Sequence, residues 1–285
     1  MVNYMIKSDY RLNEVYHIGL GPLTRINWTP TIPDFFLKLQ EGFNIIPNKL
    51  RIRSLRQDEI EEINSIRTFF GLSPLVYWAG SYAVLELRGE DNKDLLDQLY
   101  KFDLVLLSFR LLKQGGIFLQ DIYYLSGGKE RDSSVGVISF RTVPLFYDPY
   151  IMTYDEIEKV IQIFNQLEKI DLQKIHSFRI SYDRFNRYYN DANPEDQLID
   201  LCIGFEALYC KGEKFSPMGS TIGLACSMLI GENSDERNRI YQLIESAFSL
   251  RNDVVHGKEF DNSRIEDLLP EFEDYLRRSI LRLIL

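Results

Sequence analysis

Residues 240–257 of this chain read IYQLIESAFSLRNDVVHG. At about 100° per residue on a helical wheel, the apolar side chains of this stretch gather in one continuous sector. Such a sector is typical of a helix that packs against a core. Asn233 with Glu236 predicts the N-terminal cap of this helix, and Gly257 predicts its end. The stretch therefore predicts a long amphipathic helix that runs to His256.

The residues around this helix repeat the same kind of pattern. Residues 151–285 carry further capping signals, each followed by apolar residues at three-to-four spacing, and no convincing strand. These signals are Thr153 with Glu156, Asn193-Pro194, Ser216-Pro217 and Ser263 with Glu266. Pro270 is expected to break the last helix into two pieces. We expect residues 151–285 to form an all-α bundle.

Residues 1–150 have a different texture, which predicts a mixed α/β module. Apolar β-formers at 76–87, 117–125 and 135–142 predict strands, and residues 93–112 predict an apolar helix that ends at Gly115-Gly116. Prolines break every pattern in residues 10–48. The expected class is α+β, with a mixed α/β module over 1–150 followed by an α-helical domain over 151–285.

Composition excludes several classes of protein. The chain has 285 residues, of which 45% are hydrophobic, so wholesale disorder is excluded. No apolar run approaches the roughly 20 residues of a membrane span, and the N-terminus lacks the apolar core of a signal peptide. We therefore expect a cytoplasmic protein that does not enter a membrane. The three cysteines form no CxxC pair and the three histidines no HExxH motif, so neither a metal site nor a cofactor is expected.

The charge of the chain constrains its partners. The formal net charge is -9, and residues 151–285 carry nearly all of the excess of acidic over basic side chains. A protein that binds nucleic acid through bulk electrostatics is instead basic. Any contact with nucleic acid must here be local and specific.

Two charged residues interrupt apolar helix faces. Arg251 falls in the middle of the apolar sector of the helix that ends at His256, and Glu206 lies on the apolar side of the helix 195–210. An unpaired buried charge costs too much free energy to be tolerated. We therefore expect Glu206 and Arg251 to meet in a charge-assisted pair that orients the guanidinium.

These residues also carry a family resemblance. Arg251-Asn252-Asp253-Val254-Val255-His256 resembles the Arg-x4-6-His signature of the HEPN superfamily, including its common Asn after the Arg. The stretch 198–209, LIDLCIGFEALY, resembles the Glu-bearing helix of the Apea-like HEPN branch, and Asp183-Arg184-Phe185 fits the same pattern. The resemblance covers about residues 150–285.

The resemblance implies a metal-independent endoribonuclease that is active as a homodimer, of a branch found mostly in prokaryotic defence and stress response. His256 would be the general acid or base at the ribose 2′-hydroxyl and the leaving oxygen, because imidazole exchanges protons near neutral pH. Arg251 would neutralise charge on the transition state, and Asn252 would orient the phosphate or His256. Glu206 would support Arg251. The expected products are a 2′,3′-cyclic phosphate and a 5′-hydroxyl.

Other interpretations of the same residues stay open. A histidine before a terminal glycine also interacts favourably with the helix dipole. In that interpretation, Arg251 and Glu206 form a purely structural pair. The densest basic cluster, Lys49, Arg51, Arg53 and Arg56, either guides RNA to the site or is a solvated or domain-packing surface. In the leading interpretation, the first module would sense a signal or position substrate. The alternative is that the helical domain is a non-catalytic module that binds RNA, nucleotide or a partner protein, or that dimerises within a larger assembly.

Overall fold

The computed structural model describes residues 15–19, 43–47, 50–54, 61, 64–65, 67–71, 83–89, 95–115, 117, 121–126, 134–139, 150, 154–170, 175–210, 218–259 and 261–285. The chain divides into two compact units. The sheet unit comprises residues 1–103 and 118–141, and the helical unit comprises 104–117 and 142–285. Strands gathered in one unit and helices in the other confirm the predicted α+β class.

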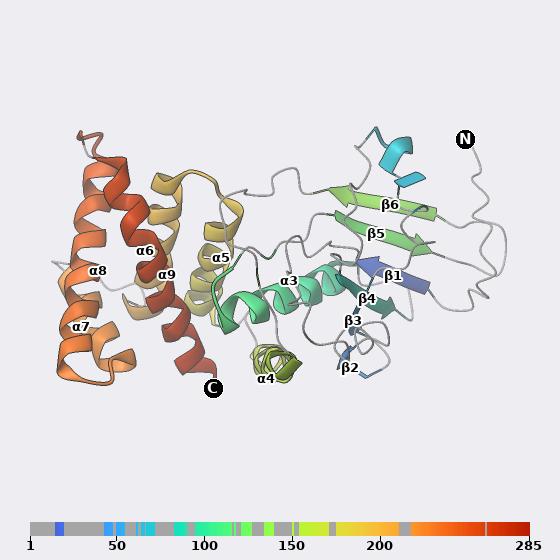
Figure 1. The fold of residues 1–285 in the computed structure, drawn as a ribbon, viewed down its shortest axis with the longest axis horizontal. Helices are drawn as coiled ribbons and strands as arrows, with labels where there is room; N and C mark the ends of the chain where they lie inside the picture. The colour runs from blue at the N-terminus through green and yellow to red at the C-terminus, as the bar shows by residue number, and fades with distance from the viewer. Residues whose placement is uncertain are drawn as a thin grey trace. The chain divides into compact units, whose positions relative to one another are not determined.

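The sheet unit contains, within the described residues, a six-stranded antiparallel sheet in the order β2-β3-β4-β1-β5-β6 (Figure 1). The strands are β1 (Val15–Gly19), β2 (Phe43–Ile46), β3 (Leu50–Ser54), β4 (Ala83–Gly89), β5 (Asp121–Ser126) and β6 (Ser134–Ser139). The β4, β5 and β6 strands confirm the expectations for these parts of the chain, whereas residues 76–82 lie outside the described residues. Sequence reasoning missed β1, β2 and β3, although β1 pairs with both β4 and β5 and β3 pairs with both β2 and β4.

The helical unit is built from a set of long helices (Figure 1). Those in the described residues are the end of α3 (Leu95–Leu112), α4 (Tyr154–Lys169), α5 (His176–Asn190), α6 (Pro194–Cys210), α7 (Met218–Ile230), α8 (Ser234–Val255) and α9 (Asn262–Ile284). Each lies where the sequence predicts a helix. Their core is apolar and includes the stacked rings of Phe205 and Phe272, with centroids 4.7 Å apart.

Helix caps agree with the sequence at two starts and differ at a third. Asn193 accepts a hydrogen bond from Glu195 N at 3.0 Å, and Asn233 accepts one from Glu236 N at 2.9 Å. For α9, the cap is Asp261, which accepts from Ser263 N at 3.0 Å, and the prediction of Ser263 as the cap is wrong. Thr153 and residues 216–217 lie outside the described residues.

Pro270 does not break the last helix, which is a second correction. α9 continues from Asn262 to Ile284 with Pro270 inside it. A proline removes one backbone donor, so a carbonyl one turn earlier loses its helical partner. Pro270 is exposed, so water can reach this carbonyl. Apolar residues on both sides of Pro270, such as Leu269 and Phe272, are buried in one core and stabilise a continuous helix.

The helical unit begins earlier in the chain than residue 151. Residues 104–117 belong to it, although the sequence predicts a division at residue 150. The physical reason is that every residue of α3 from Leu104 to Leu111 is buried. A helix buried on all sides must be enclosed by other elements. Tyr150 closes the end of α3, since its hydroxyl donates to Phe109 O at 2.8 Å.

Two further findings concern the whole described part of the chain. No helix there is long and apolar enough to cross a membrane. The cysteines Cys202, Cys210 and Cys226 are all buried and all free.

Candidate functional site

The C-terminal end of α8 positions the predicted site residues. His256 is the C-cap of α8, and the following Gly257 has a φ of 63°, a left-handed conformation that favours glycine. Gly257 N donates to Val254 O and Lys258 N donates to Asp253 O, both at 3.0 Å. This pair of bonds is a Schellman motif, which ends the helix at Val255 with His256 as its C-cap. The sequence HG thus fixes where the imidazole leaves the helix.

Arg251 lies one turn before this end and contacts α6. Its Nη2 atom lies 3.9 Å from Glu206 Oε1, and each of the two side chains is 28% exposed. The predicted meeting of Glu206 and Arg251 is therefore confirmed as a contact, at a distance too long for a direct hydrogen bond. Both residues lie at the edge of the core and not within it, which avoids most of the cost of burying a charge.

Asn252 gives Arg251 a second partner. Arg251 Nη1 donates to Asn252 Oδ1 at 3.3 Å, and the Asn252 side chain is exposed. Arg251 Nε is buried and has no hydrogen-bond partner among the described residues. The guanidinium is therefore oriented by α6 and by its neighbour, and its side chain stays partly exposed.

A buried thiol lies close to this pair. Cys202 on α6 is fully buried, and burial raises the pKa of its thiol. The charge of Arg251 lowers that pKa and the charge of Glu206 raises it. Desolvation is the largest of these effects, so Cys202 stays a neutral thiol. It is part of the packing between α6 and α8 and not a nucleophile.

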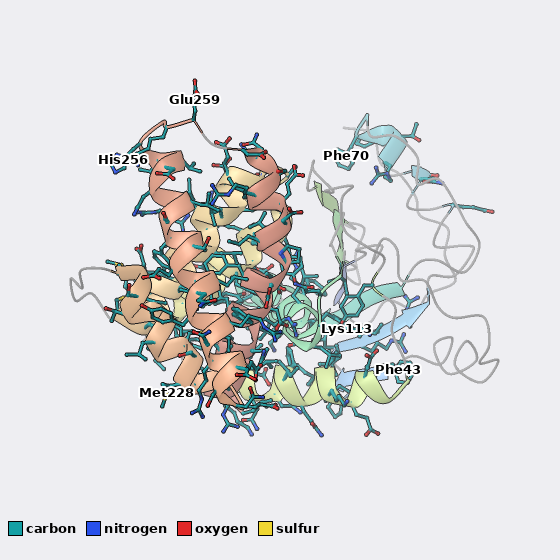
Figure 2. The ribbon with its side chains drawn as sticks, turned by 60° about the vertical axis from the view of Figure 1, so that its left-hand side comes forward. Phe43, Phe70, Lys113, Met228, His256 and Glu259 are labelled. Carbon is teal, nitrogen blue, oxygen red and sulfur yellow. The ribbon has the colours of Figure 1, made fainter. Side chains whose placement is uncertain are left out.

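His256 is not brought to Arg251 within one chain. The imidazole is exposed, and Figure 2 shows it at the tip of α8, directed away from the helices. Among the described residues, no hydrogen bond or ion pair joins it to Arg251, Asn252 or Glu206. Residues five apart on a helix are separated by about 7.5 Å along the axis and by about 140° around it, which explains the separation.

The predicted basic cluster belongs to the sheet unit. Lys49 and Arg56 lie outside the described residues. Arg51 and Arg53 are both on β3, and alternation along a strand places them on one face of the sheet. Arg53 is only 6% exposed, which fits a packing role better than an RNA-binding surface. A role of Lys49, Arg51, Arg53 and Arg56 in binding substrate stays a prediction.

Sequence reasoning missed an ion-pair cluster between α5 and α6. Arg184 Nη1 lies 2.6 Å from Asp200 Oδ1, and Arg187 Nε lies 3.7 Å from Asp200 Oδ2. The carboxylate that pairs with both arginines, Asp200, is buried. The arginines of α5, spaced three apart, were the available signal, since one helix face that carries two cations calls for an anionic neighbour.

A second missed cluster surrounds Arg110, which is 1% exposed. Its Nη1 atom donates to Asn186 Oδ1 at 2.9 Å, its Nη2 atom to Asn190 Oδ1 at 3.1 Å, and its guanidinium lies 4.7 Å from the centre of the Tyr189 ring. The Tyr189 hydroxyl in turn donates to the fully buried carboxyl of Glu273 at 2.7 Å. The residues of this cluster come from segments far apart in the sequence, so no local sequence pattern indicates the cluster.

Comparisons with family models, with curated proteins and with solved structures each found no match for this chain. Within the described residues, no group of three or more His, Cys, Asp or Glu side chains is placed to hold a metal ion. The candidate site considered below consists of Arg251, Asn252, Glu206 and His256.

Proposed function

We propose that this protein is a metal-independent endoribonuclease of the HEPN type, whose active site is formed by the α8 ends of two copies of the chain. The observation that carries the proposal is the guanidinium of Arg251. It is held at the edge of the core by Glu206 and Asn252, and its side chain is 28% exposed. It lies in the same short helical segment as an exposed histidine.

The chemistry assigns one role to each side chain. In RNA cleavage the ribose 2′-oxygen attacks the adjacent phosphorus, the bond to the 5′-oxygen breaks, and a 2′,3′-cyclic phosphate and a 5′-hydroxyl remain. An imidazole such as His256 takes the proton of the 2′-hydroxyl or returns one to the leaving 5′-oxygen. The forked donors of Arg251 match the charge that develops on the phosphorane oxygens. Glu206 positions Arg251 and does not touch substrate.

The separation of Arg251 and His256 in one chain favours a composite site. A phosphate held by Arg251 of one chain needs an acid or base near its ester oxygens, and the exposed His256 of the same chain leaves α8 in another direction (Figure 2). A second copy, related by a two-fold axis near the end of α8, would supply the missing imidazole. The exposed Val255, at 53%, lies beside His256 and provides apolar surface for such a contact.

A second candidate function is a non-catalytic module that binds RNA or nucleotide, or that dimerises within a larger assembly. The observation that favours it is that, in the described residues, no side chain orients the His256 imidazole, whereas catalytic histidines are commonly held by a third group. In this case Arg251 with Glu206 would bind an anion or a partner without turnover.

An RNA cleavage assay in EDTA separates the two candidates. We would compare the wild-type protein with His256→Ala and Arg251→Ala, and analyse the product ends. Matched controls are His176→Ala and Arg264→Ala, which remove an exposed histidine from α5 and an exposed arginine from α9. An enzyme should lose at least 100-fold in rate with either site variant, given the usual contribution of acid–base groups, and neither control should change it.

Each result has a definite meaning. Cleavage by the wild type and both controls that leaves cyclic phosphate ends, together with inactive site variants, supports the ribonuclease. RNA binding without cleavage that Arg251→Ala weakens and His256→Ala preserves supports the binding module. Equal cleavage by all five proteins would contradict both assignments of the site.

A further inference from the structure

The second buried cluster, at the end of α3, contains an ionisable group that the proposed site does not use. The carboxyl of Glu273 on α9 has no exposed surface. Oε1 accepts from the Tyr189 hydroxyl of α5, and Oε2 accepts from Gln114 Nε2, which follows α3. Gln114 Nε2 also donates to Pro270 O. One carboxyl thus joins α9, α5 and the residues that follow α3.

The positive charge nearest to Glu273 is shared with other groups. Arg277 Nε lies 3.5 Å from Glu273 Oε1, while Arg277 Nη2 pairs with Asp274 and Nη1 donates to Leu112 O at 3.4 Å. Leu112 is the last residue of α3, so this bond satisfies a carbonyl at the helix end. A charged Glu273 must therefore compete with Asp274 and with the end of α3 for the same guanidinium.

The other ionisable groups nearby add little compensation. Tyr189 is neutral, because burial and the adjacent Glu273 raise the pKa of its hydroxyl. Lys113, next to Gln114, is paired with Glu156 of α4 at 2.6 Å. Arg110 of α3 lies over the Tyr189 ring, hydrogen-bonded to α5. Desolvation consequently prevails over these partners and raises the pKa of Glu273 to about 7.

We propose that Glu273 is a proton-controlled clamp on the end of α3, closed when its carboxyl is protonated and loosened when it ionises. The Tyr189 contact survives protonation, since a hydroxyl can donate to a carboxylate or accept from a carboxyl group. An ionised Glu273 is instead stabilised by water and by a larger share of Arg277, both of which favour opening around Leu112 and Gln114. The clamp does not depend on the proposed ribonuclease activity.

The position of the clamp gives it a consequence for the fold. Residues 95–103 of α3 belong to the sheet unit and residues 104–112 to the helical unit. The clamp therefore holds the end of a helix through which the chain passes from one unit to the other. As the pH rises through neutrality, opening of the clamp would weaken the packing of residues 104–112 of α3 within the helical unit.

Amide hydrogen exchange of the full-length protein tests the clamp. The quantity compared is the protection factor of amides in residues 104–112, corrected for the intrinsic pH dependence of exchange. With a pKa near 7 in the closed state and an ordinary value in the open state, protection should fall about tenfold between pH 6 and pH 8. The Glu273→Gln variant carries no titrating group and should lose this dependence. Glu266→Gln, an exposed position on the same helix, should keep it.

A second measurement on the wild type covers the case in which Glu273→Gln does not fold. In protein labelled with ¹³C at the glutamate carboxyl, one resonance should titrate near pH 7, in step with the loss of protection. Constant protection from pH 6 to pH 8, or the same tenfold fall in folded Glu273→Gln, would overturn the clamp. So would the absence of any glutamate that titrates in this range.

Discussion

Arg110 and Arg251 are both arginines on largely apolar helix faces, and the protein treats them in opposite ways. Arg110 is 1% exposed, and its two Nη atoms make four hydrogen bonds to Asn186, Asn190 and Ile117. Arg251 is 28% exposed, lies 3.9 Å from its carboxylate partner and makes one long bond to Asn252.

The difference separates a structural arginine from a candidate functional one. The partners of Arg110 use all the donors of its two Nη atoms, so it can bind nothing else without loosening the fold. Arg251 is oriented by two weaker contacts and stays partly exposed, which is the state expected of a group that receives a ligand phosphate. An arginine on an apolar helix face therefore predicts a partner for its guanidinium. How many hydrogen bonds the guanidinium makes indicates whether the arginine is structural or is a candidate functional residue.

The largest expected loss of stability comes from substituting Arg110. Arg110→Met should destabilise the protein by about 3–5 kcal/mol, because it leaves buried carbonyl and amide oxygens without donors. Arg251→Met should cost less than about 1 kcal/mol, as for other partly exposed pairs. Urea unfolding of both variants checks the contrast. Equal losses would erase the distinction between the two arginines.

The pH dependence of stability comes next. Because burial raises the pKa of Glu273 to about 7, the folded protein holds a proton that the unfolded chain has released. This stabilisation is fully present below the ordinary pKa of a glutamate and is lost as the pH rises through 7. Between pH 5 and pH 8 the wild type should lose on the order of 2–3 kcal/mol relative to Glu273→Gln. Parallel unfolding curves for the two proteins across this range would contradict it.

The pair of Arg184 with Asp200 is intermediate in burial between Arg110 and Arg251, since the carboxylate is 5% exposed and the arginine 31%. Arg184→Met leaves Asp200 with Arg187 at 3.7 Å, and we expect a loss of about 1–3 kcal/mol. Arg187→Met is the matched control, because Arg187 is 61% exposed and should change stability by no more than about 0.5 kcal/mol. Thermal unfolding of the two variants would show whether burial of the carboxylate decides the cost.

The smallest effect concerns the candidate site itself. A double-mutant cycle on Glu206→Gln and Arg251→Met should give a coupling energy of about 0.2–1 kcal/mol, reduced by salt. A coupling of zero would mean that Glu206 does not position Arg251. If the cleavage assay succeeds, Glu206→Gln should lower the rate less than Arg251→Ala does, because Glu206 acts through the guanidinium.

The helical unit was the more predictable part of the fold. Capping residues and three-to-four spacing locate its helices because both signals are local, as Asn233 before α8 illustrates. The wheel also brings Glu206 and Arg251 together, since each is a charge on an apolar face. Pro270 was misleading because the residues packed around a long helix outweigh one missing backbone donor.

What the sequence hides is non-local. β1 is five residues long and pairs with β4 and β5, which are more than 60 residues away along the chain. The donors and acceptors around Arg110 and Glu273 come from α3, α5 and α9, and no window of sequence contains them together. The buried Asp200 is a more local case, because its partners lie on the preceding helix and their spacing was an available signal.

The division of α3 between the two units has a consequence for how the coding sequence is arranged. The helical unit consists of residues 104–117 and 142–285, and residues 118–141, which lie between these parts, include β5 and β6 of the sheet. A continuous piece of coding sequence that encodes the complete helical unit must also encode two strands of its neighbour. Recombination that moves residues 142–285 alone would deliver α5 and α9 without the arginine that bonds to Asn186 and Asn190. A continuous segment that carries the complete helical unit therefore runs from residue 104 to residue 285 and takes β5 and β6 with it.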